Sequence, residues 1–425
     1  MESKLPKNWV DTELMNLCSV YTGKKDANFA TKSGEYNFFT CAYKPLKSDS
    51  YSFEGDVLIL PGNGVNVGEV FYFSGKFEAY QRTYIINDIK IDPRYLFYHF
   101  SRFWRELGSL KQFGSATNYI KIGNFKDYKV QFPPLAEQQR IVAKLDTLFG
   151  SLDALKIRLN NIPQLIKNFK QAVLTQAVTG KLTQEWRVGK ELEEWEESKL
   201  KTFSECRLGK MLDKAKNKGQ FIDYLRNKNV RWFNIDFEDV HQMKVERSDL
   251  VKLKLEYGDI LVCEGGEPGR AAIWKNEREN IIFQKALHRI RLNSSVLPEY
   301  FLYNLKVDAV NESLNELFTG TTIKHLTGRA FSSYKILIPS IKEQTEIVKR
   351  VENLFSKADA IEKQYKTLKE KIDRLPQAIL AKAFKGELVA QLPTDGDAKD
   401  LLEEIKKLKE SLVVKPKKKV VRKKK

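Results

Sequence analysis

The sequence predicts an α+β fold in which two mixed α/β domains are separated by two long, antiparallel, coiled-coil-like helical regions. The first observation is an internal repeat, because a shift of 206 residues aligns 114–182 with 320–388 without a gap. The second is the spacing of apolar residues in the aligned copies, which alternates between four and three. A duplication of this kind implies pseudo-twofold symmetry within one chain.

The apolar spacing predicts the helical regions, because intervals of four and three place side chains along one side of a helix, as in a coiled coil. The apolar seam runs from Ile141 to Val173 in the first copy and from Ile347 to Ile379 in the second. We expect the two seams to be buried against each other. Pro163 and Pro376 interrupt them, and we expect a bend or a break at each, because an interior proline removes a helix hydrogen bond.

The segment before each helical region has the composition of short strands separated by glycine turns. Strands are expected at 56–60, 83–86, 259–262 and 288–292, and helices at 93–105 and 298–311. The expected divisions are a first variable domain (1–134), a central helical region (135–190), a second variable domain (191–339), a C-terminal helical region (340–392) and a basic, disordered tail (393–425).

The two variable domains align only in places. Gly23-Lys24 aligns with Gly209-Lys210, and Gln81-Arg82 aligns with Gln284-Lys285. Between the glycine-lysine pair and the next glycine-aspartate pair, which ends at Asp259 in the second copy, the second copy has 17 residues more than the first. The variable domains have therefore diverged more than the helical regions.

Net charge is the first indication of function. The 425 residues include 73 Lys and Arg against 55 Asp and Glu, a formal net charge of +18. This excess favours a polyanionic partner, with nucleic acid ahead of a membrane surface, and a solvated basic surface is the open alternative. The last residues, 413–425, contain eight basic residues and no acidic one. Such a tail can add phosphate contacts but cannot distinguish bases.

Cysteines and hydropathy bear on the compartment. Four widely separated cysteines argue against a zinc ribbon or a dense disulfide framework and favour reduced thiols in the cytoplasm. No stretch approaches the roughly 18 apolar residues that a membrane span needs, and the first residues lack a signal-peptide core. We expect a soluble, cytoplasmic protein without a membrane partner.

The search for catalytic motifs favours a protein without chemistry of its own. Phe132-Pro133-Pro134-Leu135 lacks the polar residue that opens the base-holding turn of a DNA methyltransferase. The glycines at 62–68 lack the Gly-Lys-Ser/Thr of a phosphate loop. The four histidines are scattered, so a metal cluster is not expected. We therefore expect no catalytic residue and no directly bound cofactor or metal.

Polar turns in the variable domains carry side chains suited to DNA. Arg and Lys can bond guanine edges, Asn and Gln can bond adenine, and glycine lets the backbone approach the duplex. The candidates in the first copy are Lys24, Lys25, Asn63, Asn66, Gln81, Arg82, Thr117, Asn118 and Lys121. The candidates in the second copy are Lys210, Arg226, Asn227, Lys228, Arg270, Lys285, Thr321, Thr322, Lys324 and His325. A turn or surface role is an open alternative for each. Glu264 and Glu267 would repel phosphate, so their loop is expected to be structural, with Arg270 neutralising it.

Several of these runs resemble the target recognition domain of type I restriction-modification specificity (S) subunits. The runs are Tyr224–Val230, Gly258–Arg270, Phe283–Leu287, Gly320–Leu326, Ile338–Gln344 and Gln176–Thr183 with Trp186-Arg187. The resemblance extends to about Leu392 and is sharper in the second half, because Pro61-Gly-Asn-Gly64 replaces the Glu-Gly-Gly-Glu pattern in the first.

The resemblance implies a non-catalytic, host-defence protein whose two target recognition domains each bind half of a bipartite, asymmetric site on double-stranded DNA. It implies docking of two modification (M) subunits, which methylate adenine with S-adenosylmethionine, and of restriction (R) subunits, which use ATP and Mg. Two alternatives stay open: a standalone nuclease or methyltransferase, and a coiled-coil adaptor or nonspecific nucleic-acid-binding protein.

Overall fold

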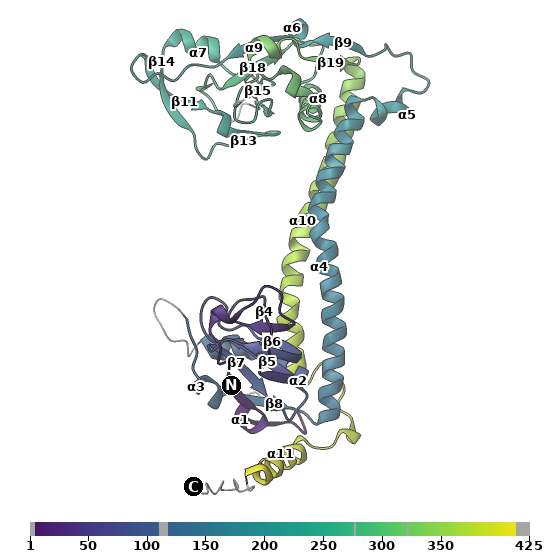
Figure 1. The fold of residues 1–425 in the computed structure, drawn as a ribbon. Coiled ribbons are helices and arrows are strands. Elements are labelled where there is room, and N and C mark those ends of the chain that lie inside the picture. Colours follow the sequence, from purple (N-terminus) through teal and green to yellow (C-terminus); the bar gives the residue numbers. More distant parts are fainter. Residues whose placement is uncertain (1–4, 110–117, 276–277, 321, 323, 414–425) are drawn as a thin grey trace. The chain divides into compact units, whose positions relative to one another are not determined.

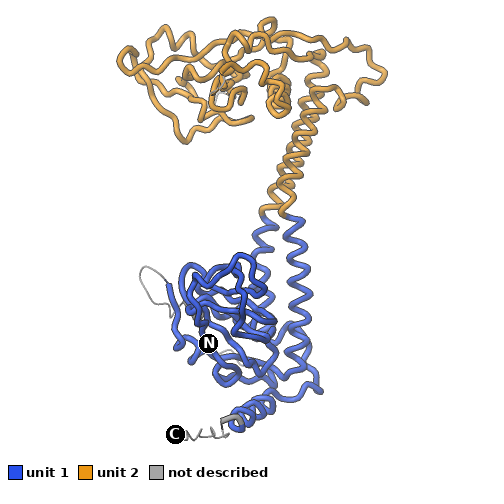
Figure 2. Tube along the Cα trace, in the orientation of Figure 1, with its two compact units in different colours: residues 1–159, 367–425 blue, residues 160–366 orange. Residues whose placement is uncertain are grey.

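The computed structural model describes residues 5–109, 118–275, 278–320, 322 and 324–413. The chain divides into two compact units, which we describe separately (Figure 2). Unit 1 comprises 1–159 and 367–425, and unit 2 comprises 160–366. Among the described residues, no helix is long and apolar enough to cross a membrane.

Domain 1, the part of unit 1 that precedes the first long helix, is built on a six-stranded mixed sheet (Figure 1). Its order is β2-β7-β5-β6-β3-β4, with β6 parallel to β3 and the other neighbours antiparallel. Alternation along β5 places Leu58 and Leu60 on the face that packs against α2, and Val57 and Ile59 on the opposite face among phenylalanines. The bounds are β2 (Ser19–Thr22), β3 (Tyr36–Phe39), β4 (Leu46–Ser48), β5 (Phe53–Pro61), β6 (Phe71–Ala79), β7 (Thr83–Asn87) and α2 (Pro93–Ser109).

Domain 2, the part of unit 2 between the long helices, distributes a related set of strands over separate sheets. One sheet has the antiparallel order β10-β18-β15-β16, a second has the order β14-β11-β17, and β12 and β13 form a hairpin. The long strand β6 of domain 1 pairs with both β5 and β3, whereas in domain 2 β16 pairs with β15 and β17 pairs with β11. The bounds are β10 (Ser204–Leu208), β11 (Gln220–Leu225), β12 (Val230–Arg231), β13 (Asn234–Ile235), β14 (His241–Val245), α7 (Arg247–Leu253), β15 (Ile260–Cys263), β16 (Ala271–Ile273), β17 (Ile281–Phe283), β18 (Leu287–Leu292) and α8 (Pro298–Val310).

A two-stranded antiparallel ladder completes each unit. It joins β1 (Val10–Glu13) to β8 (Lys129–Phe132) in unit 1, and β9 (Glu196–Lys199) to β19 (Lys335–Ile338) in unit 2. Each second strand leads into a long helix, so the Phe132-Pro-Pro run is a strand-to-helix junction. The short helices are α1 (Leu14–Leu17), η1 (Ala27–Phe29), α3 (Gly123–Lys126), η2 (Lys181–Thr183), α5 (Gln184–Arg187), α6 (Leu200–Phe203), η3 (Asn227–Asn229), η4 (Ser313–Leu317) and α9 (Gly328–Phe331).

The two long helices are α4 (Leu135–Val178) and α10 (Ile341–Phe384), each an unbroken helix through its proline. In unit 1 the start of α4, with Ile141 and Leu145, packs with the end of α10 at Leu380. In unit 2 the end of α4, with Val173, packs with the start of α10 at Ile347. The expected antiparallel pairing is therefore confirmed within each unit. A break at either proline is wrong, because the other hydrogen bonds of each long helix outweigh the one that its proline removes, and a bend at either proline stays a prediction.

The expectation of fully buried seams is also wrong. Five seam positions are 40–51% exposed, namely Leu155, Phe169, Ile361, Leu368 and Leu375. An antiparallel pair buries only one narrow side of each helix, and a spacing of 3.5 residues drifts relative to the 3.6-residue turn of a straight helix. Part of each seam therefore stays available to solvent.

A buried glutamate near the start of each long helix accounts for one repeated motif. Glu137 accepts a hydrogen bond from Trp9 Nε1 (3.2 Å) in unit 1, and Glu343 accepts one from Trp195 Nε1 (3.0 Å) in unit 2. Glu343 also accepts a bond from Thr183 Oγ1 (2.7 Å). A buried carboxylate needs such partners to offset its lost hydration. The repeated glutamates therefore join each long helix to the start of its own domain.

The glutamine that follows each glutamate has an equally local role. Gln138 accepts a bond from the Asp92 N–H (2.9 Å), just before α2, and donates to the Pro133 carbonyl (2.8 Å). Gln344 makes the same two bonds in unit 2, to the Leu297 N–H (2.8 Å) and the carbonyl of the aligned proline (2.8 Å). The repeated Glu-Gln pair is thus a structural motif.

The expected disordered tail is wrong for its first part. η5 (Pro393–Asp395) and α11 (Ala398–Val413) follow the second helical region. Ala398 and Ile405 are buried in the core of unit 1, and Lys409 donates to the carbonyl of Met15 in α1. The amphipathic pattern of α11 supplies this buried side, which a count of charges conceals. The basic residues at 414–425 lie outside the described residues.

Candidate nucleic-acid interface

Backbone hydrogen bonds gather the candidate residues of domain 1 at one place. The Gly23 N–H donates to Thr83 O (3.2 Å) and the Gln81 N–H donates to Lys25 O (2.9 Å). The Gly62 N–H donates to the carbonyl of Arg82 (2.9 Å), and the Gly64 N–H donates to that of Asn118 (2.9 Å). The turns at 23–25, 62–64, 81–82 and 118–121 therefore lie side by side.

Domain 2 gathers its candidates through the same kind of bonds. The Gly209 N–H donates to Leu287 O (3.1 Å) and the Lys285 N–H donates to Lys210 O (2.9 Å). The Leu326 N–H donates to Glu264 O (2.7 Å), as the Ile120 N–H donates to Gly62 O (3.0 Å) in domain 1. Each domain thus presents one group of turns on an equivalent backbone framework.

These bonds correct the alignment of the two copies by one residue. They make Gln81 equivalent to Lys285, not to Gln284 as the sequence pairing has it, and Lys25 equivalent to Lys210. Gly23 and Gly209 remain equivalent, because at each of them another backbone segment lies too close to leave room for a side chain. A Cβ on Gly23 would lie 2.1 Å from Ala79 O, and one on Gly209 would lie 2.3 Å from Phe283 O. Domain 1 therefore has one extra residue between the glycine and its bridging lysine.

Several domain 1 candidates have partners within the domain. Gln81 Nε2 donates to Asp26 Oδ1 (2.8 Å), and Lys25 Nζ lies 4.2 Å from the centre of the Phe29 ring. Asn66 Nδ2 donates to the Cys41 carbonyl (2.8 Å), which makes Asn66 a loop-stabilising residue. The exposed candidates of domain 1 are Lys24, Gln81, Arg82, Asn118 and Lys121, and the half-buried ones are Lys25, Asn63 and Asn66. Thr117 lies outside the described residues.

The charged candidates of domain 2 are mostly paired with acids. Asp239 lies 2.8 Å from Arg226 and 2.9 Å from Lys228, and these cations hold the pKa of its carboxyl well below the usual range. Lys210 pairs with Asp249. These acids were not foreseen, because they lie in the longer segment of the second copy, which has no aligned counterpart. Pairing lowers the positive charge that these side chains can offer to phosphate.

Arg270 and Asn227 form a second structural contact in domain 2. Arg270 Nη2 donates to the Asn227 carbonyl (2.8 Å). The equivalent carbonyl in domain 1, that of Cys41, accepts a hydrogen bond from Asn66 instead. Arg270 Nη1 also bonds Glu267 Oε2 (2.7 Å), so the expected neutralisation of this loop is confirmed. The exposed candidates of domain 2 are Lys228, Lys285, Thr322, Lys324 and His325, and Thr321 lies outside the described residues.

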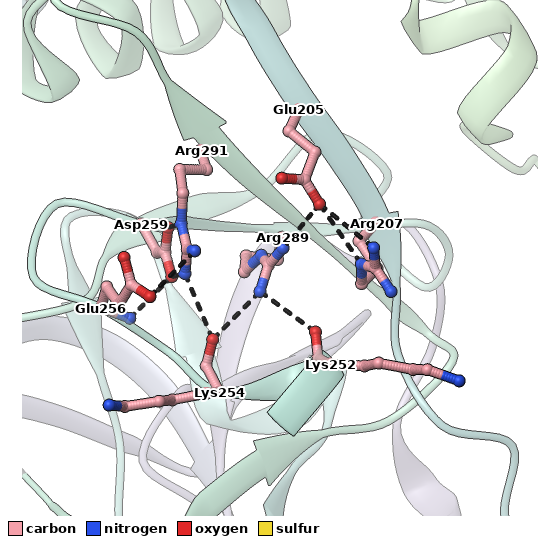
Figure 3. A network of polar contacts seen from close by, with 8 residues as sticks. All are labelled: Glu205, Arg207, Lys252, Lys254, Glu256, Asp259, Arg289 and Arg291. Atoms are coloured by element: carbon pink, nitrogen blue, oxygen red, sulfur yellow. Dashed lines mark hydrogen bonds and ion pairs between the residues drawn. The ribbon is translucent and has the colours of Figure 1, made fainter. Parts of the chain in front are cut away.

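Figure 3 shows a further charged network in domain 2, around the buried Arg289. Its guanidinium donates to the carbonyls of Lys252 (3.3 Å) and Lys254 (3.0 Å) and pairs with Glu205 (3.0 Å). Arg291 pairs with the buried Asp259 (2.8 Å). These bonds fix the end of α7 against the sheet, so this network is structural, while the side chains of both lysines point away from it (Figure 3).

In the described part of the chain, no group of three or more His, Cys, Asp or Glu side chains is placed to hold a metal ion.

The model of the type I restriction modification DNA specificity domain matches the chain twice, over residues 6–164 and 192–370. The chain belongs to this specificity family. The two matches cover both halves of the internal repeat, and the family resemblance inferred from the motifs is thereby confirmed.

Relatives of this specificity-family chain agree with that assignment. The type I restriction enzyme EcoDI specificity subunit of Escherichia coli is 31% identical over 436 residues, covering 95% of this chain and 96% of that protein. The EcoKI specificity subunit of Escherichia coli strain K12 is 37% identical over 310 residues, covering 69% of this chain and 66% of that protein. The fold resembles the crystal structure of the HsdS subunit from Thermoanaerobacter tengcongensis, with a TM-score of 0.62, 17% identity and coverage of 91% of this chain and 99% of that one.

Proposed function

We propose that this chain is the DNA-reading specificity subunit of a type I restriction-modification complex and that it binds a bipartite, asymmetric site. The observation that carries the proposal is the equivalent grouping of turns in the two domains. The framework bonds are repeated, whereas the side chains on them differ, as with Gln81 and Lys285. Base contacts specify sequence and phosphate contacts position the protein, so two different side-chain sets on one framework fit two different half-sites.

The exposed seam residues support docking of two M subunits. Leu155 in unit 1 is the repeat equivalent of Ile361 in unit 2, and Leu375 in unit 1 is the equivalent of Phe169 in unit 2. Each unit therefore exposes one residue of each pair, at 40–51% of the residue's surface, and unit 1 also exposes Leu368, whose equivalent Ile162 is half-buried. Two equivalent apolar surfaces on one chain suit two copies of one partner. Leu155→Asp should weaken binding of one M subunit and leave the other bound.

The chemistry in this proposal belongs to the partners. The chain itself is non-catalytic and binds no cofactor directly, while S-adenosylmethionine, ATP and Mg bind to the M and R subunits. The site is adenine-containing double-stranded DNA in the cytoplasm. An adaptor or nonspecific nucleic-acid-binding protein would use the same basic surface without distinguishing sequences, and the experiment below separates these possibilities.

The test is to map methylated adenines in cells that contain the chain and its M subunit. Replacing residues 1–134 with the first domain of another family member should change one half of the methylated motif only. A change in both halves would contradict the assignment of one half-site to each domain. Equal affinity of the complex for the motif and for scrambled DNA would contradict sequence-specific function altogether.

A further inference from the structure

The contact between domain and helix differs between the two units at one pair of rings. In unit 1, Tyr98 of α2 stacks on Phe149 of α4, with ring centres 5.6 Å apart and planes at 20°. The repeat equivalents in unit 2 are Tyr303 of α8 and Phe355 of α10. There, Phe233 contacts both rings, at 6.4 Å from Tyr303 and 6.3 Å from Phe355. A third ring, that of Phe233, therefore takes part in the contact between domain 2 and its long helix.

Phe233 comes from the tip of the β12–β13 hairpin, in the longer segment of the second copy. Its φ is +67°, a left-handed conformation that is costly for a bulky side chain and favours glycine. Packing of the ring against α8 and α10 is what offsets this cost. The neighbouring Trp232 contacts Phe233 (6.2 Å) and lies under Lys306 Nζ (4.3 Å). The hairpin tip is thus held against the helices by both aromatic residues.

From the hairpin a series of hydrogen bonds leads to the candidate interface. Trp232 Nε1 donates to Glu267 Oε1 (3.1 Å), and the other oxygen of Glu267 bonds Arg270 (2.7 Å). Arg270 donates to the Asn227 carbonyl (2.8 Å), and Asn227 Nδ2 donates to the Gly265 carbonyl (3.3 Å). All of these residues belong to unit 2. In domain 1 the equivalent carbonyl, of Cys41, is bonded by Asn66.

We propose that the hairpin tip, Trp232 and Phe233, together with Glu267, positions the DNA-binding turns of domain 2 relative to the long helices. These three are positioning residues, because they contact the helices and Arg270 and need not contact DNA. The inference rests on the proposed function, since it concerns recognition of the second half-site. The Trp232–Glu267 bond sets where the 264–270 turn lies, and Phe233 sets where the domain lies on its helices.

The first test measures DNA binding by the full chain in complex with its M subunits. The probes are the mapped motif, a duplex altered in the second half-site and a duplex altered in the first. Trp232→Phe keeps a ring but removes the N–H, and Glu267→Gln leaves one acceptor oxygen where two are needed, so it cannot accept from both Trp232 and Arg270. Each should lower discrimination of the second half-site by roughly tenfold and leave that of the first unchanged. The double variant should lose no more than the worse single variant, because both changes remove one linkage.

Trp186→Phe is the matched control, because Trp186 lies in the same unit and contacts Lys190 (3.3 Å), not the hairpin. It should retain discrimination of both half-sites. Wild-type discrimination in the Trp232 and Glu267 variants would overturn the positioning role and leave the proposed function intact. A wild-type complex without discrimination between the probes would instead overturn the proposed function.

The second test uses Phe233→Gly, which suits the local backbone and removes the ring. Glycine is favoured at this φ, so a folded protein is expected. The methylation map of this variant should include motifs whose unread spacer differs by one base pair, with both half-sites unchanged. A map confined to the original spacer would overturn the role of Phe233 in placing the domain.

Discussion

Domain 1 and domain 2 share a backbone framework and differ in how their polar side chains are used. In domain 1 Lys24 and Arg82 are exposed, whereas in domain 2 Lys210 and Arg226 pair with aspartates from the longer segment. The backbone hydrogen bonds between the turns recur in both domains, so the two copies of the duplication have retained the bonds that hold the turns together. Charge counted along the sequence therefore overstates the cationic surface of domain 2.

The largest difference between the units is expected from their buried glutamates. Glu343→Ala should destabilise unit 2 by about 3–5 kcal/mol, because it leaves Trp195 and Thr183 without their partner and Arg187, 3.7 Å away, without a counter-charge. Glu137→Ala should cost unit 1 about 1–3 kcal/mol, because it removes the acceptor of the Trp9 and Gln391 side chains. Hydrogen exchange resolved by unit would measure both. Equal losses would show that the two glutamates are energetically equivalent.

The helix α11 tests a feature described only in unit 1. Ile405→Ala should destabilise unit 1 by about 2–4 kcal/mol, because a fully buried side chain is truncated. Leu408→Ala is the matched control on the same helix, where the side chain is 57% exposed, and it should change stability by less than about 0.5 kcal/mol. Unit-resolved hydrogen exchange is again the measurement. Loss of protection in unit 2 would contradict a local role.

How much of this was predictable depends on the range of the interactions. The spacing of the apolar residues predicted the long helices, because that signal is local and repeated many times. The same spacing could not show that Leu155 and Ile361 stay exposed, because their exposure depends on how much of each helix surface the paired helix covers. The acids opposite Arg226 and Lys210 were missed, because pairing across strands leaves no periodic trace in one sequence. The one-residue correction at Gln81 likewise required the hydrogen bonds.

A smaller effect should follow from releasing the paired cations of domain 2. Asp239→Ala frees Arg226 and Lys228, so the affinity for nonspecific DNA should rise and its dependence on log salt should steepen by about one unit. Asp359→Ala, which breaks a pair with Lys170 on the helices, is the control and should leave the slope unchanged. Titration of binding against salt measures both. An unchanged slope in the Asp239 variant would place these cations away from DNA.

The pH dependence of the Asp239 pairs has a definite sign. Because the cations lower the pKa of this carboxyl, the stabilisation is present above its usual pKa of about 4 and is lost as pH falls below that value. Binding measured between pH 6 and 8 should therefore show no change from this group. Proton release or uptake by Asp239 in that range would contradict the pairing.

The smallest expected effect concerns thiol reactivity in domain 1. Burial raises the pKa of Cys18 to about 12 and that of Cys206 and Cys263 to about 11, so these thiols should react slowly at pH 8. Cys41, half-buried beside the Arg82 carbonyl, should be alkylated first. DNA containing the motif should slow that reaction more than scrambled DNA, as followed by mass spectrometry. Equal rates would place Cys41 outside the interface.

The division of the chain has a consequence for biosynthesis. Unit 2 is one continuous stretch, 160–366, whereas unit 1 combines a stretch before it with a stretch after it. A ribosome therefore completes every segment of unit 2 before it has made α10's last turns and α11, which the core of unit 1 contains. Unit 2 can fold during synthesis, while the core of unit 1 is completed only after α11 has been made and a long loop has closed. A chain that ends at residue 366 would thus contain all of unit 2 but lack the part of the unit 1 core that α11 and the end of α10 supply.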